Sequence, residues 1–313
     1  MKLKKPKFWD YKQPIFISYL LLPFTFPLII NNFFLKLKKN NIKNSKIKKI
    51  CIGNIYVGGT AKTPLTIKIY QILNSLKFKT ATMKKFYANH VDEQKMLAEK
   101  TKLYCLKNRN MVLDKAIRDN IEVVIFDDGL QDSSINYDLE FVCFNNIKWI
   151  GNGLLIPAGP LREKIESIKK YDAAFINGNE IDNSNLRSLI KKYNKTIKIF
   201  ESNYVVINIE KFDINEKYLI FSGIGNPDSF KETLLKYNFS IIKEIIFPDH
   251  HIYTQVDIDK IKAQAQKLNA KIITTEKDYI KINSSNNDDI KYLQIDLKIK
   301  NEIELINYLK LNI

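Results

Sequence analysis

Cysteine and histidine are scarce in this chain, whose 313 residues include three of each. The cysteines, Cys51, Cys105 and Cys143, are odd in number and have no spacing typical of a metal site. Cys51 and Cys143 lie in apolar, strand-like runs, which favours reduced thiols in a protein core. The cysteine content therefore argues against a disulfide framework and favours a cytosolic protein body.

Other signals are absent as well. The sequence has no internal repeat, no low-complexity linker, no small-residue cleavage site after its first apolar segment and no aromatic–basic pattern of an RNA motif. Its formal net charge of +16 is carried mostly by lysine, in a chain rich in Lys, Ile and Asn throughout. Because this excess follows general composition, we expect no nucleic-acid partner. The 45% of hydrophobic residues suffice for a sizeable core in one large or two ordinary domains.

The N-terminal region contains one long apolar segment, residues 14–35, of a length that could cross the ~30 Å core of a bilayer. Pro23 and Pro27 interrupt it, and lysines flank it on both sides, which gives no inside–outside bias. We predict that residues 1–48 form a membrane-associated helical segment in the cytoplasmic leaflet, with the lysines on anionic lipid. A buried helical hairpin of a soluble protein is the alternative.

The stretch from Ile50 to Leu65 has the layout of a phosphate-binding loop: an apolar strand, a glycine pair, Lys-Thr and a helix start. Backbone N–H groups would face the phosphates, Lys62 would neutralise the β/γ oxygens, and the Thr63 hydroxyl would hold Mg²⁺. The residues expected to bind ATP are Tyr56, Val57, Gly58, Gly59, Thr60, Ala61, Lys62 and Thr63.

Two positions depart from the strict G-x-x-x-x-G-K-[ST] pattern. Tyr56 replaces the first glycine and Ala61 the second. If Ala61 must adopt a positive φ, alanine costs roughly 1 kcal/mol relative to glycine, and weaker nucleotide binding is the hypothesis. A glycine-rich turn with no ligand is the alternative.

Strands and helices alternate over the remaining chain, which predicts a parallel sheet flanked by helices and a second, smaller α/β domain. We place the phosphate-loop core at residues 49–205 and a C-terminal α/β portion, which completes the catalytic cleft, at 206–313. The expected strands are residues 49–55, 79–83, 121–126, 138–143, 172–176, 196–200, 203–209, 217–222, 239–246, 271–275 and 291–295. The expected helices are residues 64–76, 93–102, 110–119, 183–193, 228–237, 255–268 and 300–310.

Polar residues gather where several expected strands end. Asp127 and Asp128 follow the strand 121–126, as Mg²⁺ ligands do in nucleotide-binding sheets. A loop rich in glycine and proline, residues 150–160, leads to a helix expected to open at Leu161, with Arg162 and Glu163 in its first turn. Three later strand ends carry the clusters Phe221–Pro227, Phe247–His251 and Thr274–Asp278. We expect an acid–base role for one of the two adjacent histidines, His250 or His251.

Taken together, these stretches resemble the tetraacyldisaccharide 4'-kinase family of lipid A biosynthesis. The stretches that carry the resemblance are Gly53-Asn54, Val57 to Pro64, Asp127 to Gln131, Gly153 to Glu163, Phe221 to Pro227, Phe247 to His250 and Thr275 to Asp278. The resemblance implies a P-loop NTPase-like fold that, with ATP and Mg²⁺, phosphorylates the 4'-hydroxyl of a lipid A disaccharide 1-phosphate, giving lipid IVA. It also implies a peripheral or monotopic enzyme, expected as a monomer, on the cytoplasmic face of the bacterial inner membrane.

The resemblance assigns roles to individual residues. Asp92 would accept the proton of the sugar hydroxyl, His250 would orient Asp92, and Lys62 would act on the phosphates. The implied metal ligands are Thr63, Asp127, Asp128 and Glu163. The implied contacts to substrate or phosphate are Glu93, Arg162 and Gln131.

The chain departs from the family pattern near these residues. Besides Ala61, the segment Lys84 to Ala88 replaces Ser-Arg-Gly-Tyr-Gly, and Asp132 replaces a histidine. A catalytically weakened kinase is therefore one alternative. A membrane-associated ATPase or nucleotide switch that binds a partner is another, although it leaves Asp92 and His250 unexplained.

Overall fold

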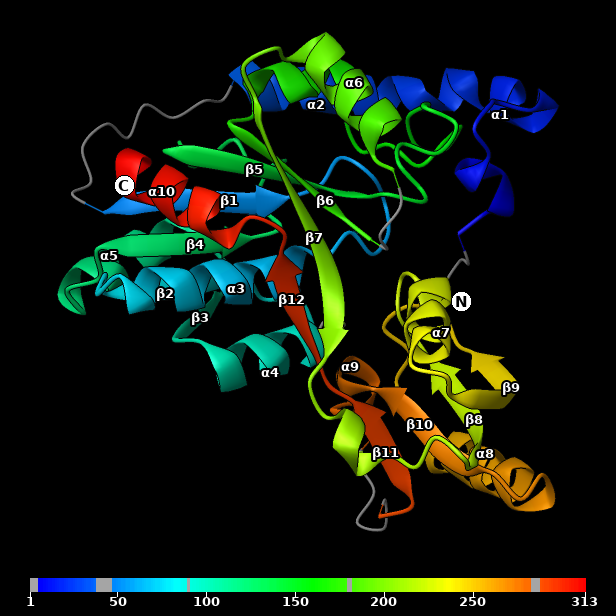
Figure 1. The fold of residues 1–313 in the computed structure, drawn as a ribbon. Coiled ribbons are helices and arrows are strands. Elements are labelled where there is room, and N and C mark those ends of the chain that lie inside the picture. The colour runs from blue at the N-terminus through cyan, green and yellow to red at the C-terminus, as the bar shows by residue number, and fades with distance from the viewer. Residues whose placement is uncertain (1–4, 38–46, 89–90, 179–181, 283–287) are drawn as a thin grey trace. The chain divides into compact units, whose positions relative to one another are not determined.

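The computed structural model describes residues 5–37, 47–88, 91–178, 182–282 and 288–313 (Figure 1). The chain divides into two compact units, each built from separate stretches of sequence. The larger unit combines residues of the stretches 3–86, 100–203 and 297–313. The smaller unit combines residues 87–99 with residues 204–296. The segment 87–99, expected in the phosphate-loop core, thus belongs to the smaller unit, and the last residues of the chain belong to the larger one.

The N-terminal segment is helical, as expected, but in short pieces. Its elements are η1 (Lys7–Asp10), α1 (Phe16–Leu20), η2 (Leu22–Thr25) and α2 (Phe26–Leu37). Pro23 lies in η2 and Pro27 in α2. Within the described residues, no helix combines the length and apolar character needed to cross a bilayer. The predicted membrane association stays a prediction.

The larger unit contains a sheet with the strand order β12-β7-β6-β5-β1-β4-β2-β3. Its strands are β1 (Lys48–Gly53), β2 (Thr80–Lys85), β3 (Leu103–Leu106), β4 (Val123–Asp127), β5 (Leu139–Asn145), β6 (Ala173–Asn177), β7 (Lys198–Val206) and β12 (Ile295–Ile299). β1 lies between β4 and β5 and runs parallel to both. The carboxyl ends of these three strands therefore share one edge of the sheet, at the point where the strand order reverses, which is where ligands bind in such sheets.

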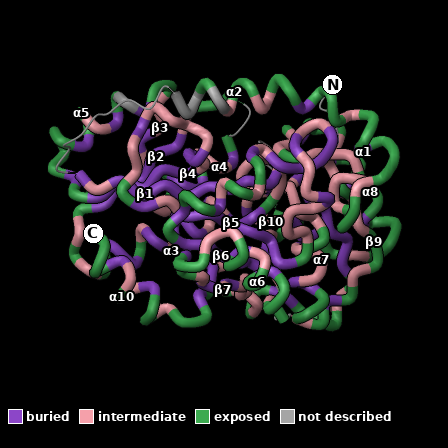
Figure 2. The backbone as a smooth tube through the Cα atoms, turned by 90° about the horizontal axis from the view of Figure 1, so that it is seen from above, coloured by how far each residue is buried: buried purple, intermediate pink, exposed green. Residues whose placement is uncertain are grey.

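The central strands are buried on both faces, as Figure 2 shows for β1, β4, β5 and β6. This explains their continuous apolar sequence, since strands covered by helices on both faces do not alternate with polar residues. Phe126 and Cys143 are almost completely buried in this core, and each fully buried large side chain contributes about 1.5–3 kcal/mol. The other elements of this unit include α3 (Lys62–Ser75), α5 (Asn110–Arg118), η3 (Ile165–Lys170), α6 (Ser184–Tyr193) and α10 (Glu302–Asn312).

The smaller unit contains a parallel sheet with the strand order β11-β10-β8-β9. Its elements are α4 (Val91–Lys100), η4 (Ile209–Lys211), β8 (Lys217–Ser222), α7 (Pro227–Lys236), β9 (Ser240–Ile246), α8 (Gln255–Lys267), β10 (Lys271–Thr275), α9 (Glu276–Tyr279) and β11 (Ile290–Leu293). Alternate residues of β8 are buried in two hydrophobic clusters, Tyr218 and Ile220 in one and Leu219 and Phe221 in the other. The carboxyl ends of β8, β9 and β10 are neighbours, so the side chains that follow these strands can meet.

The structure corrects three expected elements. The strands expected at 196–200 and 203–209 form the single strand β7. The structure also contains two strands that were not predicted, β3 and β12. No helix opens at Leu161, because its N–H donates to the Leu154 carbonyl at 3.0 Å and the Arg162 N–H donates to the Ile55 carbonyl at 2.7 Å. These bonds hold the stretch in strand-like bridges, and the next helical turn, η3, begins at Ile165.

Candidate functional site

The glycine loop, defined here as residues 56–61, connects β1 to α3 and is held from inside by Asn54. The Asn54 amide donates to the Tyr56 carbonyl at 2.6 Å and to the Thr60 hydroxyl at 2.9 Å. Its oxygen accepts a hydrogen bond from the Arg162 guanidinium at 2.9 Å. Asn54 is 1% exposed, so a single buried amide fixes both ends of the loop and one arginine beside it.

The loop ends at Ala61, the residue before the first turn of α3. Ala61 adopts φ 66° and ψ 24°, the left-handed conformation. Ala61 therefore has the positive φ at which alanine is strained relative to glycine. Lys62 and Thr63 follow as the first two residues of α3, where N–H groups without an intrahelical partner form an anion-binding site.

Replacing Ala61 with glycine is expected to tighten ATP binding by up to about fivefold. The left-handed conformation costs an alanine roughly 1 kcal/mol, and glycine adopts it freely. Ala61→Val is the matched variant, since a β-branched side chain is more strained at positive φ and should weaken binding. Titration with ATP measures both dissociation constants, and equal affinity of wild type and Ala61→Gly would contradict the argument.

Asp127, the last residue of β4, is tied to the start of α3. Its carboxylate accepts a hydrogen bond from the Thr63 hydroxyl at 2.9 Å and pairs with the Lys84 ammonium at 2.6 Å. The side chains of Asp127 and Lys84 are 0% and 4% exposed. Lys84 comes from β2, whose register places it beside Asp127 of β4. The arrangement holds a carboxylate, a hydroxyl and an ammonium at one sheet edge.

Asp128 follows Asp127 in the left-handed conformation, with φ 58°. A non-glycine residue with positive φ at a sheet edge is typical of a functional position. Its carboxylate accepts a hydrogen bond from Arg162 at 2.7 Å. Burial raises the pKa of Asp128, but the charges of Lys62, Arg162 and Lys84 outweigh burial and lower this pKa well below its ordinary value. Asp128 is therefore a carboxylate at neutral pH.

Gln131 and Glu163 form a second polar group in the larger unit. The Gln131 amide donates to the Asn54 carbonyl at 2.9 Å and to Glu163 at 2.8 Å. Glu163 also accepts hydrogen bonds from Lys170 at 3.1 Å and from the Tyr171 hydroxyl at 3.3 Å. The Gln131 carbonyl oxygen is buried and has no hydrogen-bond donor among the residues that the structure describes.

These oxygen groups fit Mg²⁺, which prefers carboxylate, hydroxyl and carbonyl oxygens. Thr63, Asp127 and Asp128 provide such oxygens beside α3, and the Gln131 carbonyl adds one with no donor. Within the described ranges, no three His, Cys, Asp or Glu side chains gather as a preformed metal cage. A Mg²⁺ ion held mostly by phosphates and water does not require one. The predicted ligand Glu163 already accepts from three protein donors, and its role as a metal ligand stays a prediction.

The smaller unit brings Asp92 and His250 together. Asp92 lies in the first turn of α4, and His250 follows β9 in the left-handed conformation, with φ 56°. The His250 Nδ1 lies 3.1 and 3.0 Å from the two Asp92 carboxylate oxygens. The Asp92 side chain is 1% exposed, whereas that of His250 is 16% exposed.

Two lysines complete this cluster. The Lys277 ammonium, on α9, lies 3.2 Å from Glu93, 3.5 Å from Asp92 and 3.7 Å from Asp249. The Lys281 ammonium lies 3.7 Å from Asp92. Burial raises the pKa of Asp92, but the His250 hydrogen bond and the charges of Lys277 and Lys281 lower this pKa well below its ordinary value.

Asp278 joins the strand ends that form the cluster. Its carboxylate accepts hydrogen bonds from the Gly223 N–H and the Tyr253 hydroxyl, both at 3.0 Å, and pairs with Lys281 at 2.6 Å. Its side chain is completely buried. The polar stretches that follow β8, β9 and β10 therefore lie together in this unit.

His251 has a different environment from its neighbour. Its ring stacks on Phe247 with centroids 4.6 Å apart, and its Nε2 lies 3.1 Å from Asp257 in the first turn of α8. The Asp257 carboxylate also accepts a hydrogen bond from the Thr254 N–H, in a capping box. His251 therefore stabilises a helix end, and His250 is the candidate for acid–base chemistry.

Sequence reasoning missed four residues that hold these groups in place: Asn54, Lys84, Lys277 and Lys281. One signal was available, because Lys84 and Asp127 each directly follow an expected strand, 79–83 and 121–126, and such strands are parallel neighbours in the sheet. Asn54 and Lys277 lie in stretches that carried the family resemblance, but neither received a role. Lys281 lies three residues after Asp278, the last residue of these stretches, and residues three apart are neighbours on the surface of a helix.

The chain is similar along its length to proteins of known family. A family model described as "Tetraacyldisaccharide-1-P 4'-kinase" matches residues 18–93 and 80–312. A protein from Pelagibacter ubique named tetraacyldisaccharide 4'-kinase is 50% identical over 314 residues, which cover 100% of this chain and 99% of the relative. A protein of the same name from Rickettsia bellii is 32% identical and covers 96% of each chain.

A solved structure agrees with the fold. The crystal structure of "apo" form LpxK from Aquifex aeolicus in complex with ATP matches with a TM-score of 0.72, over 95% of this chain and 99% of that one. The sequence identity is 19%, so this likeness establishes the fold alone: an α/β protein with a mostly parallel sheet, as predicted. Given full-length identities of 32% and 50% and a family model that matches nearly every residue, this chain belongs to the tetraacyldisaccharide-1-P 4'-kinase family.

Proposed function

We propose that this protein is an ATP-dependent lipid kinase, which transfers the γ-phosphate of ATP to the 4'-hydroxyl of a tetraacyldisaccharide 1-phosphate and forms lipid IVA. The observation that carries the proposal is the buried Asp92–His250 pair, with its 3.0 Å contact, in a chain that also has a phosphate-binding loop. A nucleotide switch needs the loop but has no use for a carboxylate–imidazole pair. A kinase needs both, because it must also position a hydroxyl group.

The larger unit supplies the groups for ATP. Phosphoryl transfer needs positioning and charge stabilisation more than covalent chemistry. Lys62 neutralises the β/γ oxygens, and the first N–H groups of α3 donate to them. Arg162 and Lys84 add two cations near Asp128. Thr63, Asp127 and Asp128 would hold Mg²⁺, which when bound neutralises charge on the transferred phosphate.

The smaller unit supplies the groups for the acceptor. Asp92 orients the sugar hydroxyl and takes its proton, while His250 fixes the direction of the carboxylate. The low pKa of Asp92 makes it a weak base. This suffices in a loose transition state, in which the hydroxyl proton leaves late and little base strength is required. Glu93, Arg162 and Gln131 are proposed contacts to the sugar lipid or its phosphates.

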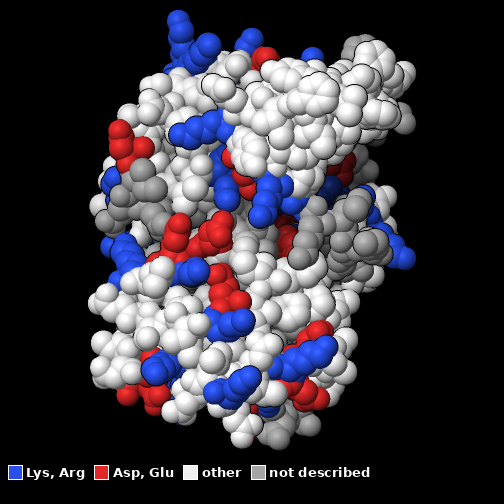
Figure 3. Space-filling view, turned by 90° about the vertical axis from the view of Figure 1, so that its right-hand side faces the viewer, with Lys and Arg blue, Asp and Glu red and all other residues white. Residues whose placement is uncertain are grey.

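The N-terminal segment is proposed to bind the cytoplasmic face of the inner membrane, where the lipid substrate resides. Several of its large apolar side chains are exposed, among them Phe16 (84%), Leu20, Phe24 and Phe26. Figure 3 shows a broad area without charged side chains in its upper part, where Figure 1 places α1. Exposed apolar area of this kind, with lysines nearby, fits an interface with anionic lipid.

Transfer of ³²P from labelled ATP to tetraacyldisaccharide 1-phosphate, in detergent micelles, tests the proposal. We expect a phosphorylated lipid that requires both ATP and Mg²⁺. ATP hydrolysis without transfer would favour the nucleotide switch. Transfer that proceeds slowly but depends on Lys62 would instead identify a weakened kinase.

The pH dependence of transfer tests how Asp92 is kept ionised. Because Lys277 lowers the pKa of Asp92, Lys277→Gln should raise this pKa and move the acidic limb of kcat/KM to higher pH. In the wild type that limb should lie below the ordinary aspartate range of about pH 4. Lys277→Arg, which keeps the charge, is the control. Equal shifts in both variants would mean that the charge of Lys277 is not the cause.

The lowered pKa of Asp92 also makes the stability of the folded protein depend on pH. A carboxyl group with a lower pKa in the folded than in the unfolded state stabilises the fold fully above its unfolded pKa, about 3.9. This contribution declines as pH falls from there toward the folded pKa. Acid unfolding of Lys277→Gln should therefore begin at higher pH than that of Lys277→Arg.

A further inference from the structure

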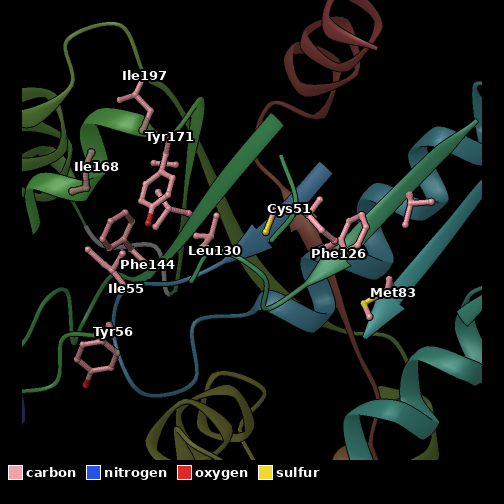
Figure 4. Close-up of a cluster of buried hydrophobic side chains, with 14 of the residues drawn as sticks. Cys51, Ile55, Tyr56, Met83, Phe126, Leu130, Phe144, Ile168, Tyr171 and Ile197 are labelled. Atoms are coloured by element: carbon pink, nitrogen blue, oxygen red, sulfur yellow. The ribbon is translucent and has the colours of Figure 1, made fainter. Parts of the chain in front are cut away.

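Tyr56 stands where the phosphate-loop pattern has its first glycine, and its side chain links the loop to the N-terminal segment. The ring is 2% exposed and contacts Gly58, where an added Cβ would lie 2.8 Å from the Tyr56 Cε1. Figure 4 shows its phenol oxygen pointing away from the neighbouring hydrophobic side chains. That hydroxyl donates a hydrogen bond to the Asp10 carboxylate in η1.

Lys5 strengthens this link. Its ammonium pairs with Asp10 and also lies 4.4 Å from the centroid of the Tyr56 ring. The Lys148 ammonium is 3.6 Å from the same carboxylate. Burial raises the pKa of Asp10, but the Lys5 and Tyr56 hydrogen bonds outweigh burial and lower it. Burial and Asp10 together raise the pKa of Tyr56. At neutral pH a protonated phenol therefore donates to a carboxylate, a stronger kind of hydrogen bond than a neutral one.

The same N-terminal segment also holds the loop 150–163. The Trp9 indole donates to the Pro157 carbonyl at 3.0 Å, and the Asn152 N–H donates to the Trp9 carbonyl at 3.0 Å. The Asn32 amide donates to the Arg162 carbonyl at 3.1 Å. Arg162 in turn contacts Asp128 and Asn54. The segment thus reaches the glycine loop in two ways: directly through Tyr56, and indirectly through Arg162 and Asn54.

We propose that Tyr56 is a positioning residue for ATP, through which the N-terminal segment sets the conformation of the glycine loop by way of Asp10. This rests on the proposed ATP binding of the loop, but not on the identity of the acceptor. The hydrogen bond to Asp10 fixes the orientation of the Tyr56 ring, and the ring limits the conformations that the backbone can adopt at Gly58. Asn54 contacts both Tyr56 and Thr60, so the same restraint reaches Thr60. Losing the hydroxyl should leave the fold intact and the loop less ordered for phosphate.

The experiment measures ATP affinity of the full chain in detergent micelles, without a lipid acceptor, by calorimetric titration. We expect Tyr56→Phe and Asp10→Asn each to weaken ATP binding by roughly three- to tenfold. The double variant should lose less than the summed free energies of the two single variants, because both changes remove the Tyr56–Asp10 hydrogen bond. Tyr11→Phe, in the same segment, is the matched control and should bind like the wild type.

Two further readouts separate positioning from a general structural role. KM for ATP should rise in Tyr56→Phe, while kcat at saturating ATP stays within about twofold. The thermal unfolding midpoint without nucleotide should stay close to that of the wild type. Unchanged ATP affinity in Tyr56→Phe, or additive losses in the double variant, would overturn the proposal. Should Tyr56→Phe fold poorly, Asp10→Asn tests the same contact from the other side. A wild-type chain that binds no ATP would refute the proposed function instead.

Discussion

Lys62→Ala is expected to lower the rate of phosphate transfer by roughly 10²–10³-fold, the usual loss when a preorganised group that stabilises transferring charge is removed. Lys62 is the first residue of α3 and directly follows Ala61, which has the left-handed conformation. The backbone conformation of the glycine loop therefore determines where Lys62 lies. The charge of Lys62 also lowers the pKa of the nearby Asp128 carboxyl group. Single-turnover transfer with saturating ATP measures the loss.

Lys68→Ala is the matched control, since Lys68 lies in the same helix and pairs with Glu302 at 3.0 Å. Its turnover should equal that of the wild type. Thermal unfolding of both variants checks that each is folded. Near-normal transfer by Lys62→Ala would refute the assignment of the loop to the ATP phosphates.

Asp92→Ala and His250→Ala are each expected to lower kcat by roughly 10²–10⁴-fold, the range for general acid–base residues. Because the two side chains share one contact at 3.0 Å, the double variant should lose much less than the summed free energies of the single variants. A complete cycle of four proteins, assayed at one pH, gives the coupling energy. Strict additivity would mean that the pair does not act as a unit.

Two controls make this cycle specific. His251→Ala removes the adjacent imidazole, which contacts Asp257 and not Asp92, and should keep most of the wild-type kcat. Asp92→Asn keeps the volume of Asp92 and removes its charge. Because the buried Asp92 carboxylate lies beside Lys277 and Lys281, removing its charge should also lower the free energy of unfolding. Urea unfolding separates that effect from catalysis.

The fold was predictable where apolar strands were long and fully buried. β1 and β4 contain apolar runs that end at glycine or aspartate, β5 contains the apolar run 141–144, and the sequence placed all three strands within a few residues. β3 was missed because it has only four residues, of which one is buried. The helix expected to open at Leu161 failed because the hydrogen bonds of Leu161 and Arg162 to distant carbonyls outweigh local helix preference. Tertiary contacts of this kind cannot be derived from local pattern.

The candidate site was predictable to different depths. The Asp92–His250 contact came from family resemblance, since 158 residues separate the two and no spacing rule joins them. Lys84 was noted only as a departure from the family pattern. The structure gives it a buried ion pair with Asp127, which depends on strand register and not on neighbouring residues. The consequence of Ala61 was derivable from physical chemistry alone once its φ was known.

The discontinuous smaller unit affects how the protein is made. α4 leaves the ribosome long before β8, β9 and β10. The residue that Asp92 contacts, His250, is synthesised 158 residues after Asp92. At 5–20 residues per second, that delay is roughly 8 to 30 s. The smaller unit therefore cannot complete its folding around Asp92 until the segment that contains His250 has been synthesised. A gene fragment that begins after β7 would encode the sheet of the smaller unit without Asp92.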